Sequence, residues 1–169
     1  MGRMMIAEKL SKVDKIPGEI VEIVQESVIN TFTSICGGTP ECVQQEDESG
    51  PLNGIIGNIA VFNADHTFSL MIAIPKATAL KISDAFLGME LPFESHDMGD
   101  LIAEIANILA GEVAANIEKV GFRGQSSLPT ATRGSDLTLF MPNKPPSAKM
   151  KFSSDCGDFM LNMALSESR

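Results

Sequence analysis

The sequence predicts an α+β domain in which long helices pack on one face of a mostly antiparallel sheet. Three observations support this fold class. Long segments place apolar residues at helical spacing, shorter segments alternate apolar and polar residues as strands do, and short turns connect consecutive strands. A helix followed by strands occurs on either side of a central helix, which is consistent with a two-unit internal repeat.

Length and composition indicate one domain that folds without structural metals or disulfides. The chain has 169 residues, and its three cysteines contain no CxxC pair, so reduced thiols are expected. We assign residues 1–14 to an N-terminal tail and residues 15–169 to the domain. The net charge is -9 and no cluster of Lys or Arg is present, which argues against binding to nucleic acid or to anionic membranes.

The sequence shows no pattern typical of a targeting or membrane-spanning segment. The opening residues are mildly basic but lack the apolar stretch of a signal peptide. The longest apolar run, residues 68–74, is far shorter than the roughly 20 residues that a membrane-spanning helix needs. We therefore expect a cytoplasmic protein that does not insert into membranes.

The first helix is predicted to begin at Pro17, because proline suits the first position of a helix. Its apolar residues recur one turn apart, at Ile20, Val24, Val28 and Phe32. Gly37-Gly38 end the pattern, as glycine commonly does after a helix. Residues 41–49 follow, and their acidic run at 46–48 is typical of a solvent-exposed strand or loop.

Residues 55–62 and 67–74 are predicted to form an antiparallel hairpin. Apolar and polar residues alternate along both segments, and a short turn that contains Asn63 and Asp65 separates them. A second helix is predicted from Pro75 to Leu87, ended by Gly88. Residues 89–96 then lead into the longest helical pattern of the chain.

That pattern extends from Asp97 to Val120, with Asp97 as the expected cap. At helical spacing, one side is expected to be apolar: Leu101, Ile102, Ile105, Ile108, Leu109 and Val113. The opposite side is expected to be polar and flanked by small residues: Asp100, Glu104, Asn107, Gly111 and Glu118, with Ala103, Ala110 and Ala114 beside them. Gly111 costs about 1 kcal/mol relative to alanine inside a helix, so its bare backbone suggests close approach by another molecule.

After this helix, residues 121–124 and 128–130 are predicted to be irregular. Three further strands are predicted at residues 137–141, 148–152 and 159–165. The first two are connected by a proline-rich segment, and the last two are separated by a short turn at residues 155–157. These strands would extend the antiparallel sheet that the first hairpin begins.

Most familiar catalytic motifs are absent from the sequence. It contains no GxxxxGK[ST], GxGxxG, GxSxG or HExxH, and neither His66 nor His96 has a second ligand at a zinc spacing. Arg133 lies in a glycine-flanked loop, where a functional arginine is one interpretation and an ordinary surface arginine is the default. Glu104 and Asn107 remain, three residues apart and therefore neighbours on the helix surface. By spacing alone, such a pair is most often two solvent-exposed polar residues without a specific function.

The segment Glu104-Ile-Ala-Asn107-Ile-Leu-Ala-Gly111 resembles the ExxNxxxG motif of the CheC/CheX/FliY family of chemotaxis phosphatases. The similarity extends to residues 54–62, 75–88 and 128–130, and covers about residues 15–165. The first helix offers only Glu22-Ile-Val-Gln25 and Glu26-Ser-Val-Ile-Asn30 as a second motif, with the wrong residue or the wrong spacing. A single motif resembles a CheX-like domain more than a CheC-like one.

The resemblance implies hydrolysis of the phospho-aspartate of a phosphorylated CheY-type receiver domain. Asn107 would position the attacking water and Glu104 would dock on the regulator's active-site lysine. Asp100, Gly111, Ala103, Ala110 and Ala114 would contact this partner. The chain would carry no cofactor, because magnesium would be held by the regulator, and it would form a homodimer.

Two alternatives fit the same sequence. A non-catalytic module could use the same helix face to bind a response regulator or a flagellar component, because a contact helix and a catalytic helix have similar sequences. The fold could also be reused for a small ligand, which would require an apolar pocket.

Overall fold

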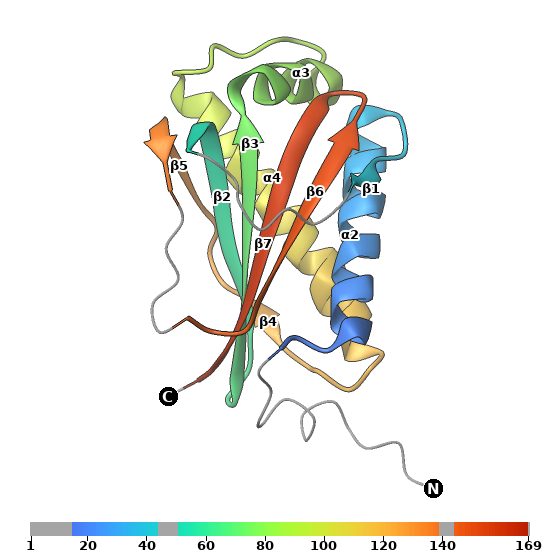
Figure 1. The fold of residues 1–169 in the computed structure, drawn as a ribbon. Coiled ribbons are helices and arrows are strands. Elements are labelled where there is room, and N and C mark those ends of the chain that lie inside the picture. The colour runs from blue at the N-terminus through green and yellow to red at the C-terminus, as the bar shows by residue number, and fades with distance from the viewer. Residues whose placement is uncertain (1–14, 44–50, 139–143, 169) are drawn as a thin grey trace, which may run out of the picture.

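A computed structural model describes residues 15–43, 51–138 and 144–168 of the chain and confirms the predicted α+β class (Figure 1). Within these ranges, three helices accompany a seven-stranded sheet. The helices are α2 (Gly18–Cys36), α3 (Lys76–Leu87) and α4 (His96–Glu118). The strands are β1 (Glu41–Val43), β2 (Leu52–Phe62), β3 (His66–Pro75), β4 (Gln125–Ser126), β5 (Thr130–Leu137), β6 (Ser147–Ser154) and β7 (Gly157–Glu167).

All neighbouring strands in the sheet are antiparallel. The order is β1-β6-β7-β3-β2-β4, and β5 also pairs with β2. The predicted hairpin is present as β2 and β3, with Ile55 opposite Ile74 and Phe62 opposite Thr67. A second hairpin, β6 and β7, lies beside it through the pairing of β7 with β3.

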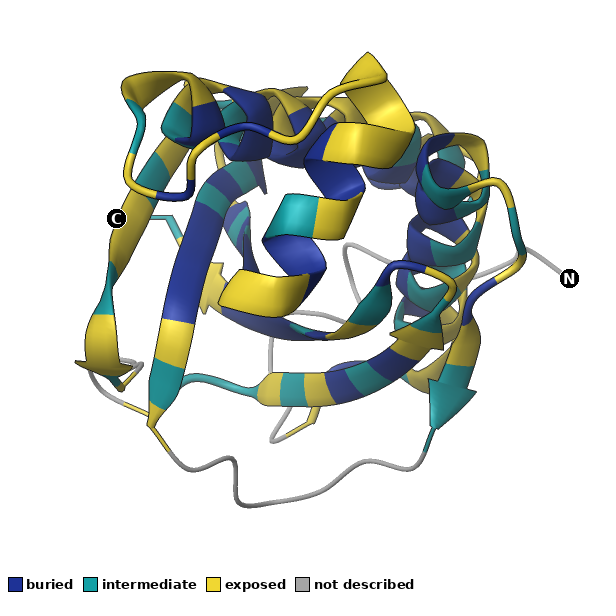
Figure 2. Cartoon of the chain, turned by 90° about the horizontal axis from the view of Figure 1, so that it is seen from above, coloured by how far each residue is buried: buried dark blue, intermediate teal, exposed yellow. Residues whose placement is uncertain are grey.

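The two long helices α2 and α4 cover one face of the sheet, and α3 lies across one end (Figure 1). Buried residues of both helices meet those of the strands between the two layers, as Figure 2 shows. Phe32 of α2 stacks on Phe159 of β7 with 4.0 Å between ring centroids. This contact packs α2 against β7, in the interior of the sheet.

Proline and glycine delimit the first two helices as predicted. Pro17 and Pro75 immediately precede α2 and α3. Gly37 and Gly88 follow them in the left-handed conformation, with φ of 79° and 73°. Glycine adopts this conformation without steric cost, and the Gly37 N–H donates to the Thr33 carbonyl oxygen.

The strand predicted at residues 137–141 is observed only at its first residue within the described part of the chain. Strand β5 spans Thr130–Leu137 instead, residues 139–141 lie outside the described part, and β4 forms near residues expected to be irregular. The reason is exposure: no residue of β5 is buried, so its sequence lacks the apolar alternation by which a half-buried strand is predicted. The acidic run at 46–48 and the N-terminal tail at 1–14 also lie outside the described residues.

The cysteines of the described residues are all free thiols. Burial, together with a hydrogen bond to the Cys36 thiol, raises the pKa of Cys156 to about 12. Within residues 15–43, 51–138 and 144–168, no three His, Cys, Asp or Glu side chains gather as a metal site would require. In the same ranges, no helix has both the length and the apolarity to cross a membrane.

Candidate functional site

Helix α4 lies directly on strand β2, and a glycine of the strand makes this close approach possible. A Cβ atom at Gly57 would lie 3.2 Å from the Ile102 side chain and 3.3 Å from the Ala106 Cβ. The helix buries one side against the sheet and α2: Met98, Leu101, Ile102, Ile105, Ala106, Leu109, Ala110, Val113 and Ile117. The opposite side of α4 is therefore fixed in direction and faces solvent.

The start of α4 differs from the predicted start. Ser95, not Asp97, caps the helix: its Oγ accepts a hydrogen bond from the Met98 N–H at 3.1 Å and donates to the Pro92 carbonyl oxygen at 2.7 Å. Asp97 lies in the first turn, where its carboxylate interacts favourably with the positive end of the helix dipole. The error arose because serine and aspartate are both good caps and lie two residues apart.

Arg133 holds the segment that leads into α4. Its Nη1 donates to the carbonyl oxygens of Phe93 (2.9 Å) and Ser95 (2.8 Å), and its guanidinium lies 5.9 Å from the centre of the Phe93 ring. The side chain thus ties β5 to the capping residue of the helix. Sequence reasoning treated Arg133 as an ordinary surface residue, since nothing in its neighbourhood along the chain indicates these contacts.

Glu104 and Asn107 are both exposed on the solvent side of α4. Neither side chain forms a hydrogen bond or salt bridge with any other described residue. One turn further along, Gly111 is exposed, and a Cβ atom placed on it would meet nothing within 4 Å. The fold itself therefore does not require glycine at this position.

The flanks of this side partly differ from the prediction. Ala103 and Ala114 are half-buried beside the polar residues, as expected, but the expected exposure of Ala110 is wrong, because it is fully buried. Ile108, assigned to the apolar side, is 39% exposed instead. Four residues separate positions on one helical ridge, so Ile108 lies above Glu104, whereas Ala110 lies above the buried Ala106.

Asp100 extends the exposed side toward the helix start. Its Oδ2 lies 3.3 Å from the Nδ1 of His96, four residues earlier, and both side chains are largely exposed. Ala115, which the sequence analysis did not single out, is exposed at the other end. Helical spacing from Gly111 would have identified it.

Helix α2 packs along the flank of α4 through a small polar network. Asn116 Nδ2 donates to the Ser27 Oγ at 3.1 Å and to the Glu112 Oε1 at 3.2 Å. Asn30 Nδ2 donates to the same Glu112 oxygen at 3.4 Å. Asn30, which belongs to the imperfect motif on α2, therefore has a hydrogen-bond partner on α4. Asn107 has no hydrogen-bond partner among the described residues.

The chemical capacity of the exposed side follows from its groups. An amide both donates and accepts hydrogen bonds, so Asn107 can orient a water molecule without adding negative charge. A carboxylate at Glu104 can pair with a cation of a docking protein. The open backbone at Gly111 leaves room for that protein to approach.

The fold matches those of solved chemotaxis proteins, which defines its structural class. The CheX structure from Vibrio vulnificus matches with a TM-score of 0.79 at 20% identity, over 88% of this chain and all of that one. CheX from Desulfovibrio desulfuricans gives 0.77 at 19% identity, over 88% of this chain and 99% of that one. A CheX–CheY–BeF3–Mg2+ complex from Borrelia burgdorferi gives 0.71 at 18% identity, over 88% and 98%.

The family profile described as chemotaxis phosphatase CheX matches residues 55–153, which is more than half of the chain. This chain therefore belongs to the CheX family. Among curated proteins, no relative matches the sequence.

Proposed function

We propose that this chain hydrolyses the phospho-aspartate of a CheY-type receiver domain, with the exposed side of α4 as its active surface. The observation that carries the proposal is the arrangement on α4. Glu104 and Asn107 are exposed together, without partners among the described residues, beside a glycine whose side-chain position is empty. An amide and a carboxylate left free in this way are available to a partner protein.

Asn107 is the group that acts on the reacting atoms. Phosphoryl transfer requires mainly positioning and electrostatic stabilisation, with little covalent help from the protein. The Asn107 amide would hold the attacking water in line with the phosphorus–oxygen bond that breaks. An amide is better suited than a carboxylate here, because a negative charge would repel the phosphoryl oxygens.

Glu104 serves docking. Its carboxylate, one turn from Asn107, would pair with the lysine that the resemblance places in the regulator's active site. Such an ion pair would fix the orientation of α4 relative to the phosphoryl group of the docked regulator. Ile108, Gly111 and Ala115 extend the contact surface along the same exposed side of α4.

Magnesium belongs to the partner in this proposal. The Borrelia burgdorferi complex contains CheX, CheY, BeF3 and Mg2+ together. We propose that the regulator's own acidic residues hold the ion here as well, so that this chain contributes the water-orienting amide and the docking carboxylate only.

A phosphate-release assay against the receiver domains of the host tests the function. We expect the full chain to accelerate phosphate loss from at least one phosphorylated receiver in the presence of Mg2+. Tight binding to a phosphorylated receiver without faster phosphate release would instead select the non-catalytic binding module and overturn the enzyme assignment.

Glu104→Gln is expected to weaken receiver binding by about tenfold, because a charge-assisted contact becomes a neutral one. The affinity of the wild type should fall as salt is raised, and that of the variant should fall less. Titration calorimetry at two salt concentrations measures both. Glu26→Gln, an exposed glutamate of α2, is the matched control and should behave as wild type. Equal salt dependence in wild type and Glu104→Gln would contradict the docking role.

We also propose that the chain forms a homodimer, on the resemblance to CheX proteins alone. Light scattering coupled to gel filtration measures the mass in solution. A monomeric mass at micromolar protein concentration would contradict this proposal and leave the phosphatase proposal untouched.

A further inference from the structure

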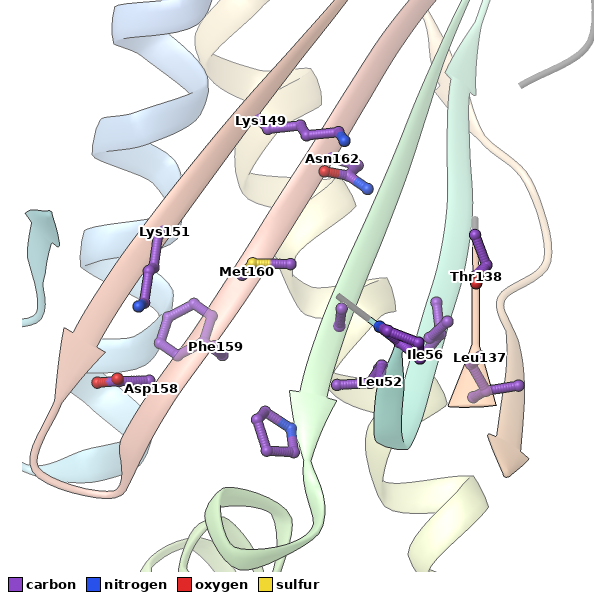
Figure 3. A pocket seen from close by; sticks show the side chains of 13 residues that line it. Leu52, Ile56, Leu137, Thr138, Lys149, Lys151, Asp158, Phe159, Met160 and Asn162 are labelled. Carbon is purple, nitrogen blue, oxygen red and sulfur yellow. The ribbon is translucent and has the colours of Figure 1, made fainter. Parts of the chain in front are cut away.

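The sheet face opposite α2 and α4 carries a second apolar cluster, separate from the main core. Ile56, Met71 and Ala73 are buried there, with Leu52, Leu137 and Met160 packed around them. No helix among the described residues covers this face (Figure 1). A cavity of about 340 Å³ opens over the cluster, and Figure 3 shows the side chains that line it in front of β7, β3 and β2. This volume is at the small end of ordinary ligand pockets.

A buried carboxamide at the wall of this cavity lacks a partner. Asn162 on β7 lines the cavity and is only 8% exposed. Its Oδ1 is buried without a hydrogen-bond partner among the described residues. The Oδ1 is closed off from solvent, so a ligand would bind this carboxamide through its Nδ2, which is not fully buried and forms no hydrogen bond with a described residue.

Two lysines of β6 stand beside this carboxamide. The sheet register places Lys149 opposite Asn162 and Lys151 opposite Met160, and both lysines line the cavity (Figure 3). Neither forms a salt bridge with another described residue. Asp158 is the acidic residue of the lining, and it lies opposite Ser153, two residues beyond Lys151 along β6. The cavity therefore combines an apolar floor with cations at one side, in a chain of net charge -9.

We propose that this cavity binds a small amphipathic acid. Its apolar body would cover Ile56, Ala73 and Met160, and a polar group next to that body would hydrogen-bond the Asn162 carboxamide. Its acidic group would pair with Lys149 and Lys151. The site is separate from Glu104 and Asn107, which lie on α4 behind the sheet, so the proposal does not depend on the phosphatase function.

Charge and size favour this ligand class over other occupants. A second copy of this acidic chain could offer negative charge to the two lysines. A flat protein face would nevertheless not enter a cavity of this size. An uncharged apolar molecule would leave both lysines and the Asn162 Nδ2 without partners. An acid with an adjacent amide or hydroxyl group satisfies all three.

Calorimetric titration of the full chain with N-octanoylglycine tests the proposal. This probe has an apolar tail, an amide and a carboxylate. We expect saturable binding with one site per chain, and binding at least about tenfold weaker for the uncharged methyl ester and for octanoate, which lacks the amide. The double variant Lys149→Met/Lys151→Met should lose the preference for the acid, whereas Lys81→Met, an exposed lysine of α3, should retain it.

A variant that fills the cavity provides an independent test. Ala73→Leu places extra side chain on the floor and should abolish probe binding while phosphatase activity is retained. Should this variant fail to fold, the lysine variants still test the proposal, because neither lysine is buried: Lys149 is exposed and Lys151 is half-buried.

Several results would overturn the proposal. Equal affinity for the acid and its methyl ester, or unchanged binding in the double lysine variant, would remove the charge argument. A change of mass in solution on replacing the lysines would assign this face to a second copy.

Discussion

Replacing Asn107 with alanine is expected to slow dephosphorylation of the cognate receiver by about 10²–10³-fold, as the loss of one oriented hydrogen-bonding group does in other active sites. The attacking water would lose its partner, while docking through Glu104 would remain. The protein should be slightly more stable, by about 0.5 kcal/mol, because alanine is the better helix former and the exposed Asn107 side chain makes no contact that the fold requires. Single-turnover release of phosphate from the phosphorylated receiver measures the rate.

Asn30→Ala provides a matched control for this substitution. Asn30 is also an exposed helical asparagine, but it belongs to α2 and bonds Glu112. Its replacement should leave phosphate release near the wild-type rate. The mechanism is refuted if Asn107→Ala keeps full turnover, or if its loss of rate is matched by an equal loss of receiver affinity, since that would make Asn107 a docking residue only.

Gly111→Ala is expected to change stability and activity in opposite directions. Alanine should stabilise the protein by about 1 kcal/mol, because it is a better helix former and its methyl group meets nothing within 4 Å. Phosphatase activity should nevertheless fall by up to about 10²-fold, because the methyl group would displace the docked receiver by a fraction of an ångström or more. Thermal or chemical unfolding and phosphate release measure the two effects.

Gly99→Ala separates these effects. Gly99 also lies on α4 with open space at its Cβ position, but near the helix start, away from Asn107. This control should gain stability of similar size without losing activity. Wild-type kinetics in Gly111→Ala would show that the regulator does not approach the helix at this point.

Most of the fold could be predicted because its longer elements are amphipathic. Helices α2 and α4 and the hairpins β2–β3 and β6–β7 each bury one side, and a buried side leaves a periodic pattern in the sequence. Strand β5 could not be placed, because it lies exposed against β2 and its residues record no periodic burial. Its position is determined by pairing, which depends on residues distant along the chain.

The candidate site shows the same division. The exposure of Glu104 and Asn107 follows from helical spacing. The burial of Ala110 and the exposure of Ile108 depend on how far α4 is rotated about its axis against the sheet, and residue type alone does not predict that rotation. The contacts of Arg133 join positions about 40 residues apart, and the cavity near Asn162 is formed by residues of five strands and the segments beside them. Neither the Arg133 contacts nor the cavity produces a pattern within a short stretch of sequence from which it could be predicted.

The contact at Gly57 has a consequence for how a partner would be bound. Because one side of α4 is packed closely against β2, the Glu104 and Asn107 side chains stand on a helix that is held in place before any partner arrives. Binding of a partner to this helix would incur little of the conformational entropy loss that ordering a loop requires, and the interaction energy from docking at Glu104 would remain available for alignment. A preorganised surface of this kind can bind, react and release its protein partner without refolding between turnovers.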